Sequence, residues 1–212
     1  MYIAEPQRPA VHAGGSNMLI SSRRRYSRQR GTSLVEVLVT LVILAFGLLG
    51  VAGLQGKMSL AEMESYQRSQ ALMALTEMTE RLSANAAQVA GYLGQGTIGT
   101  NDAQPAVCTG LTGPARDLCD WSNSLKGASE TKSAANVGGM VGAVGCITQI
   151  QASNPALGVC TAGIYQVSVA WQGMSPTAAT PALACGAGTF GADEAYRRVI
   201  AAAVTVGTTS CY

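Results

Sequence analysis

The segment Gly31-Thr32-Ser33-Leu34-Val35-Glu36 separates an arginine-rich leader from a long apolar run, and this order decides the fold of the N-terminal part of the chain. An ordinary secretory signal carries its cleavage site after the apolar run, whereas here the small residue Gly31 and the carboxylate of Glu36 stand at its beginning. We therefore expect cleavage before the apolar run, which stays on the mature protein.

The leader, residues 1–31, carries the positive charge of the chain. It contains six arginines and one glutamate, a net charge of +5, and because the whole chain has a net charge of +2, the other 181 residues carry −3. Only eight lysines and arginines are scattered over those residues, so the sequence predicts no nucleic-acid partner. Residues 1–17 have no coherent period, and we expect translation to start at Met18.

The apolar run predicts a membrane-crossing helix over residues 32–56. Val37 to Gly56 are 20 residues without a charge, close to the roughly 20 that a spanning helix needs. The arginines before the run predict a cytoplasmic leader and a periplasmic C-terminal part. Glycines stand at every third position of its distal half: Gly47, Gly50, Gly53 and Gly56. Small residues at such spacings let membrane helices pack closely, although these four are equally typical of any membrane helix.

The hydropathy pattern becomes one-sided after Lys57, which predicts an amphipathic helix over residues 57–90. Apolar residues recur there at intervals of three and four, and we expect this stripe to lie in the core: Leu60, Met63, Leu75, Met78 and Leu82. The first breakers are Gly91 and Gly94, so the helix should continue to about Val89.

Residues 91–145 are rich in Gly, Ser, Thr, Ala and Asn, which predicts a connecting region with little regular structure. One short helix is expected there, beginning at Pro114 and including Trp121, because proline is favoured at the first helical position. Its apolar residues Leu118, Trp121 and Leu125 share one face.

Residues 146–212 contain the strand candidates. Apolar and polar residues alternate over 165–172, the period of a half-buried strand, and 146–151 and 198–206 are the other candidates. Such a small antiparallel sheet needs a cover over its apolar face. The sequence therefore predicts an α+β fold in which the amphipathic helix packs on the sheet.

Six cysteines predict disulfides in an oxidising compartment, and six allow 15 connectivities. We expect sequential pairing: Cys108 with Cys119, Cys146 with Cys160, and Cys185 with Cys211. A zinc site is the alternative, but no pair has the C-x-x-C spacing and no histidine follows the leader.

The sequence offers little for catalysis, since its only histidine is His12 in the leader. The mature chain therefore lacks the usual general base and the commonest catalytic metal ligand. We interpret the carboxylates of the C-terminal part as solvated turn residues: Asp102, Asp117, Asp120, Asp193 and Glu194. No phosphate-binding or dinucleotide-binding motif is present, so we expect a protein that is not an enzyme and has no cofactor or metal.

The order of arginines, Gly31, Glu36 and apolar run resembles the type IV prepilin signature, in which a dedicated peptidase cuts after a glycine and leaves a glutamate as the fifth mature residue. The resemblance implies a long helix on a meander, the pilin fold, with the prepilin peptidase as a partner. Thr32, where most pilins have phenylalanine, would be the new N-terminus and the site of N-methylation. Glu36 would pair with the N-terminal amine of its own or of a neighbouring subunit, and the four glycines would lie in the helical core of a filament.

The segment Tyr165–Gly173, with Cys185-Gly186 and Tyr196-Arg197-Arg198-Val199 after it, is similar to PilV-type minor pilins. This resemblance implies a type IV pilus modification protein that works with other minor pilins and the major pilin. Such a protein helps to prime pilus assembly in the inner membrane and to present a tip adhesin, in adhesion and twitching motility. It would span the inner membrane once and then move to the pilus at the cell surface.

Three alternatives fit the same sequence. A minor pseudopilin of a type II secretion system would share the whole N-terminal pattern. A signal-anchored periplasmic binding domain would keep its leader. Sec-type cleavage near Ala52 or Gly53 would release a soluble periplasmic protein.

Overall fold

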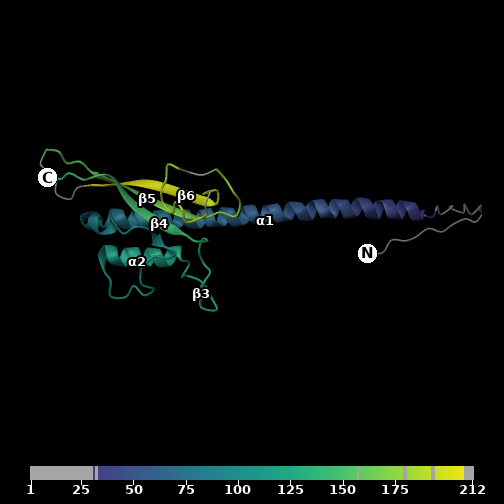
Figure 1. Ribbon diagram of the computed structural model, residues 1–212, viewed down its shortest axis with the longest axis horizontal. Coiled ribbons are helices and arrows are strands. Elements are labelled where there is room, and N and C mark those ends of the chain that lie inside the picture. Colours follow the sequence, from purple (N-terminus) through teal and green to yellow (C-terminus); the bar gives the residue numbers. More distant parts are fainter. Residues whose placement is uncertain (1–30, 32, 157, 179–180, 192–193, 208–212) are drawn as a thin grey trace, which may run out of the picture. The chain divides into compact units, whose positions relative to one another are not determined.

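The computed structural model describes residues 31, 33–156, 158–178, 181–191 and 194–207 (Figure 1). These residues form two compact units that divide after Leu48. The first unit consists of the beginning of helix α1. The second, which we name the head, comprises the described residues from 49 onward.

Helix α1 extends from Leu34 to Ala84 and supplies one wall of the core of the head. Its buried residues recur at helical spacing on one face: Gln67, Ala71, Ala74, Leu75, Met78 and Leu82. The expected burial of Leu60 and Met63 is wrong, because both are 49% exposed. Gln67 is the first residue of α1 that the rest of the head buries.

The α-helix also ends before the predicted Val89. After Ala84 the chain continues as a 3₁₀-helix, η1, from Ala86 to Tyr92, in which Val89 and Tyr92 are buried. This tighter turn brings both side chains into the same core as the buried face of α1.

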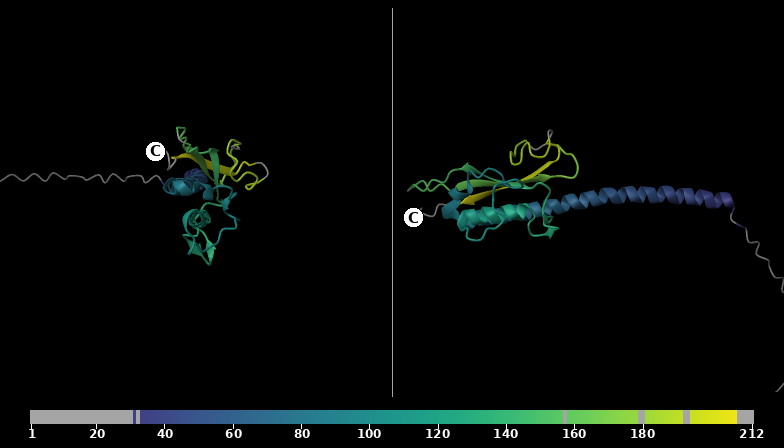
Figure 2. Two further views of the ribbon diagram at one scale, coloured as in Figure 1. Left: turned by 90° about the vertical axis from the view of Figure 1, so that its left-hand side faces the viewer. Right: turned by 60° about the horizontal axis from the view of Figure 1, so that its bottom comes forward.

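Four antiparallel strands form the main sheet, in the order β1-β4-β5-β6. Their bounds are β1 Ile98–Gly99, β4 Val144–Gln151, β5 Gly163–Gln172 and β6 Arg197–Val206. The three longer strands contain the three predicted ones, and the predicted α+β class of a long helix packed on an antiparallel sheet is confirmed (Figure 2).

The two faces of the sheet bury different sets of residues, as the alternation in β5 predicts. Val167, Val169 and Trp171 lie in the large core with the buried face of α1. On the other face Ala170 packs with Val144, Cys185 and Phe190 in a small second cluster.

Helix α2, Gly113–Leu125, closes the core beside α1 and the β1–β4 side of the sheet. Leu118, Trp121 and Leu125 are buried, as the shared face predicts. The indole Nε1 of Trp121 donates a hydrogen bond to the backbone oxygen of Ala74 at 2.9 Å. Residues 91–145 are more regular than predicted, since a small hairpin of β2 (Thr131–Lys132) and β3 (Ala135–Asn136) follows α2.

Two disulfides join described residues. Cys108–Cys119 is confirmed. The other two predicted pairings are wrong, because Cys146 is bonded to Cys185, 39 residues away, and not to Cys160. The bridge joins strand β4 to the segment between β5 and β6. The fold brings these two segments together, and their separation in the sequence did not indicate the contact. Cys160 is also disulfide-bonded, and Cys211 lies outside the described residues.

Gly145 in β4 is the glycine on which the position of Trp121 depends. A Cβ atom at Gly145 would lie 2.1 Å from the Trp121 ring, far inside van der Waals contact. We expect Gly145→Ala to lower the free energy of unfolding by roughly 1–3 kcal/mol, the usual cost of overpacking a core. The measurement is urea unfolding of the full chain in detergent micelles, followed by tryptophan fluorescence.

Gly207→Ala is the matched control, because a Cβ atom there would meet nothing within 4 Å. Equal stability of the Gly145→Ala variant and the wild type would contradict the tight packing of Trp121 on β4.

Asp102 fixes the turn after β1 to the end of α2. Its carboxylate accepts hydrogen bonds from the backbone N–H of Gly99 at 2.7 Å and from the Lys126 ammonium group at 2.5 Å. Burial alone would raise the pKa of Asp102, but the hydrogen bonds to its carboxylate, which include a third from the backbone N–H of Gln104 at 3.2 Å, together hold the pKa below its ordinary value.

A lowered pKa in the folded state means that ionised Asp102 stabilises the fold above the ordinary carboxyl pKa, and that this contribution is lost as the pH falls through the folded-state value. We expect Asp102→Asn to lower the thermal midpoint at pH 7, and the difference from wild type to shrink on acidification to about pH 2. Glu130→Gln, at an exposed position, should change neither. A difference independent of pH would exclude the ionised carboxylate as the cause.

Candidate functional site: the start of α1 and the ion pairs of the head

Ser33 and Glu36 form the first turn of α1. The backbone N–H of Glu36 donates to the Ser33 side-chain oxygen at 3.2 Å and to the Ser33 carbonyl oxygen at 2.9 Å. Serine at the N-cap with glutamate at the third helical position is the capping-box pattern. The Ser33-x-x-Glu36 spacing can be seen in the sequence and identifies Ser33 as the N-cap of the helix. The apolar run alone did not predict this role.

The Glu36 side chain is exposed, and its carboxylate has no ion pair within the described part of the chain. A negative charge in the first turn complements the helix dipole. Thr32 lies outside the described residues, so the pairing of Glu36 with the Thr32 amine stays a prediction. The same holds for cleavage after Gly31, which the geometry does not test.

The apolar part of α1 presents its side chains outward on every side. Leu34 is 89% and Phe46 72% exposed, and the other large apolar residues up to Leu54 are exposed as well. Among the described helices, α1 alone has the length and composition to cross a membrane, and no residue of its apolar window is buried within the chain.

The four glycines of this helix have no packing role within the described part of the chain. A Cβ atom at Gly47, Gly50, Gly53 or Gly56 would meet nothing within 4 Å. Each costs about 1 kcal/mol of helix stability relative to alanine. Intramolecular contacts therefore do not account for them.

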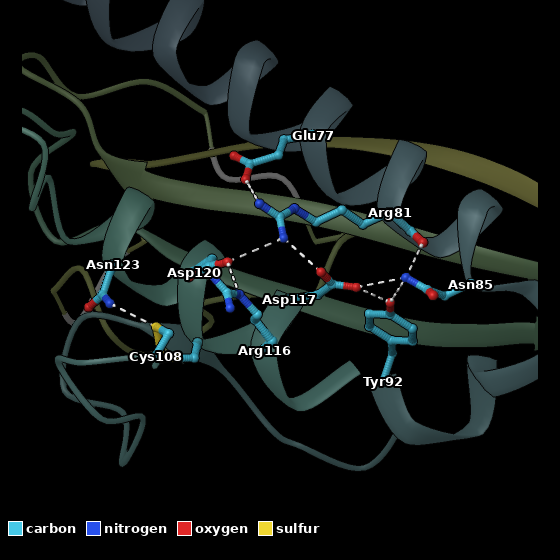
Figure 3. Close-up of polar contacts among 10 residues, drawn as sticks. Glu77, Arg81, Asn85, Tyr92, Cys108, Arg116, Asp117, Asp120 and Asn123 are labelled. Carbon is cyan, nitrogen blue, oxygen red and sulfur yellow. Dashed lines mark hydrogen bonds and ion pairs between the residues drawn. A yellow bond between two sulfur atoms is a disulfide. The ribbon is translucent and has the colours of Figure 1, made fainter. Parts of the chain in front are cut away.

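Arg81 holds α1, η1 and α2 together (Figure 3). Its guanidinium group pairs with Asp117 of α2 at 2.7 Å and with Glu77, one turn earlier on α1, at 2.7 Å. The other Asp117 oxygen accepts hydrogen bonds from Asn85 at 2.8 Å and from the Tyr92 hydroxyl group. Burial and the hydrogen bond to Asp117 raise the pKa of Tyr92 far above its ordinary value, so the phenol remains a donor.

The interpretation of the carboxylates as solvated turn residues is wrong for four of the five. Asp117 and Asp120 lie on α2 and face Arg81, Asp102 pairs with Lys126, and Glu194 pairs with Arg197. Asp193 lies outside the described residues. The partners of Asp117 and Asp102 are distant in sequence and only the fold brings them into contact, whereas Arg197 lies three residues after Glu194.

A second set of polar contacts joins α1 to β6. Arg198 donates from Nε to Glu64 at 2.6 Å and from Nη2 to the Ser175 carbonyl oxygen at 2.7 Å. The second Glu64 oxygen accepts from the Ser175 hydroxyl group at 3.2 Å. These contacts fix the segment after β5 and the start of β6 against α1. The polar groups of Arg198, Glu64 and Ser175 form hydrogen bonds with one another, so these residues are suited to stabilising the head.

Within the described ranges, no three or more His, Cys, Asp or Glu side chains come together to hold a metal ion. A hollow of about 670 Å³ lies beside β4. Its lining is neutral among the described residues and includes Thr148, Gln149, Ser168 and the Cys146–Cys185 bridge.

Residues 26–52 match the prokaryotic N-terminal methylation motif, the prepilin signal of type IV pilins and pseudopilins. Comparisons with curated proteins and with solved structures find no match. The matched segment includes Gly31, the capped first turn with Glu36, and most of the exposed apolar surface. Pilin-like proteins are generally structural, and a motif of this kind indicates anchoring in the inner membrane, processing by a prepilin peptidase and assembly with other pilins. The motif and the helix that begins within it therefore support a type IV pilin-like protein.

Proposed function

We propose that the protein is a minor pilin of the type IV pilus that helps to prime pilus assembly in the inner membrane and to present a tip adhesin. The observation that carries the proposal is the methylation motif at residues 26–52, followed by a helix whose apolar side chains are exposed on all sides. The similarity of Tyr165–Gly173 and the residues after it to PilV-type minor pilins supports the minor-pilin assignment.

The exposed apolar surface explains how such a subunit is held before and after assembly. In the membrane the side chains of Val37 to Gly56 contact lipid, and in a filament they contact the helices of other subunits. Both surroundings keep apolar side chains out of water, so the transfer between them need not expose them. The glycines allow the close approach of neighbouring helices that this exchange requires.

Glu36 supplies the register of assembly in this proposal. Once the peptidase cuts after Gly31, the amine of Thr32 carries a positive charge four residues before the Glu36 carboxylate. A carboxylate at the edge of an apolar surface is costly without a partner. An incoming subunit whose amine meets the Glu36 of its neighbour removes that cost, and a subunit shifted along the filament does not.

Processing is the first test. We expect N-terminal sequencing and intact mass of the protein from the membrane of the native cell to show a chain that starts at Thr32. Gly31→Val should leave the leader attached, whereas Gly50→Ala, an equally open position on α1, should be cleaved normally. A wild-type chain that retains its leader would make the protein a signal-anchored domain and overturn the proposal.

The register is tested separately with Glu36→Gln. Glutamine can serve at the third position of a capping box, so the variant removes the charge and keeps the helix start. We expect normal cleavage and a severalfold loss of the protein from sheared pili, measured by quantitative immunoblot. Glu62→Gln removes a carboxylate from an exposed position on the same helix and should change neither quantity.

Undiminished incorporation of the Glu36→Gln variant would remove the register argument. Recovery of the wild-type protein with a secretion apparatus, and its absence from sheared pili, would assign it to the pseudopilins instead.

A further inference from the structure

The two edges of the main sheet are protected very differently. The outer edge of β4 is shortened by β1, which pairs with Val144 and Gly145, and its register on β5 shifts between Gln149 and Gln151. Bulges and short edges are devices that prevent a sheet from adding further strands.

Strand β6 has none of these devices. Its ten residues pair with β5 without a register shift, from Arg197 opposite Gln172 to Val206 opposite Gly163. The eight residues Val199–Val206 contain no charge and no proline. Backbone bonds outside the strand ladder reach only its first residue, Arg197, within the described part of the chain. A long, regular and uncharged edge of this kind is a template for another strand.

The side chains of β6 would gain from such a strand. Ile200, Ala202 and Val204 pack against the core that α1 and β5 share, yet each stays partly exposed. A strand beside β6 would cover them with its own alternating side chains. Burial of apolar area would therefore add to the main-chain hydrogen bonds.

A small cavity beside the start of β6 indicates which type of side chain the added strand would carry there. About 130 Å³ in volume, it is lined by Glu64, Arg68, Trp171, Arg198, Val199 and Ile200. Glu64 and Arg198 pair with each other. Arg68 has no ion pair within the described residues, and the buried Nε1 of Trp171 has no acceptor. The cavity wall thus has an excess positive charge and a spare donor, which suits a carboxylate.

We propose that β6 binds an extended segment of another polypeptide by strand addition, with an acidic side chain of that segment beside Arg68. The partner is a different protein and not a second copy of this chain. A second copy paired through its own β6 would bring no carboxylate to Arg68, because residues 197–206 contain neither aspartate nor glutamate.

The experiment uses the full chain in detergent micelles and two labelled nine-residue peptides of alternating valine and threonine. One peptide carries aspartate near one end and the other carries lysine at the same position. We expect the aspartate peptide to slow hydrogen exchange of the backbone amides of residues 199–206 and not those of residues 146–151. By fluorescence anisotropy the lysine peptide should bind about twofold to fivefold more weakly, the range for an exposed charge pair.

Arg68→Glu should reverse the order of the two peptides, whereas Arg116→Glu, a change of charge on exposed α2, should leave it as in the wild type. Ala203→Lys, at an exposed position of the edge, should abolish the protection of β6. Absence of protection at β6, protection at β4 instead, or an unchanged order in Arg68→Glu would each overturn the proposal. Neither cleavage nor pilus assembly is needed for this test, so it can fail while the proposed function stands.

Discussion

The apolar side chains of the first half of α1 have to be kept out of water, and the arrangement of the whole protein follows from this requirement. Each large apolar side chain contributes roughly 1.5–3 kcal/mol when it leaves water, and those from Leu34 to Leu54 are exposed in the described part of the chain. Contacts among the described residues do not meet this demand. A bilayer or the helices of other subunits can, and the methylation motif over residues 26–52 belongs to proteins that use both.

The second half of the same helix has a different role, because it forms part of a head that must be stable in water. From Gln67 onward one face of α1 is buried under the sheet and α2, while Arg81 and Glu64 extend ion pairs to α2 and β6. Ion pairs at half-exposed positions contribute little individually. Here they join α1 to α2 and to β6, while the buried apolar side chains of the core, Trp121 and Val167 among them, supply most of the free energy of folding.

Local patterns in the sequence predict the elements well and their long-range contacts poorly. The charge-free run, the alternation in residues 165–172 and the face of Leu118, Trp121 and Leu125 depend on neighbours along the chain, and each was predicted. Leu60 and Met63 share the period of the buried stripe, but where the head ends on α1 depends on its tertiary packing. The partners of Asp102, Asp117 and Cys146 lie far away in the sequence, so local pattern did not identify them. At the start of α1 the cap at Ser33 could be predicted from the sequence. Contacts with other subunits could not, because they depend on a second molecule.

Because Cys146 pairs with the distant Cys185, correct oxidation of the head depends on the order in which the cysteines become available and the strands pair. For a chain that enters an oxidising compartment from its N-terminal side, Cys160 arrives before Cys185, and the shorter loop from Cys146 to Cys160 closes more readily. The native bond then depends on whether β5 pairs with β4 before an oxidant reaches Cys146, or on thiol exchange that replaces the early bond. In an oxidising compartment the yield of the native Cys146–Cys185 bond would therefore depend on how fast β4 and β5 pair relative to the oxidation of Cys146.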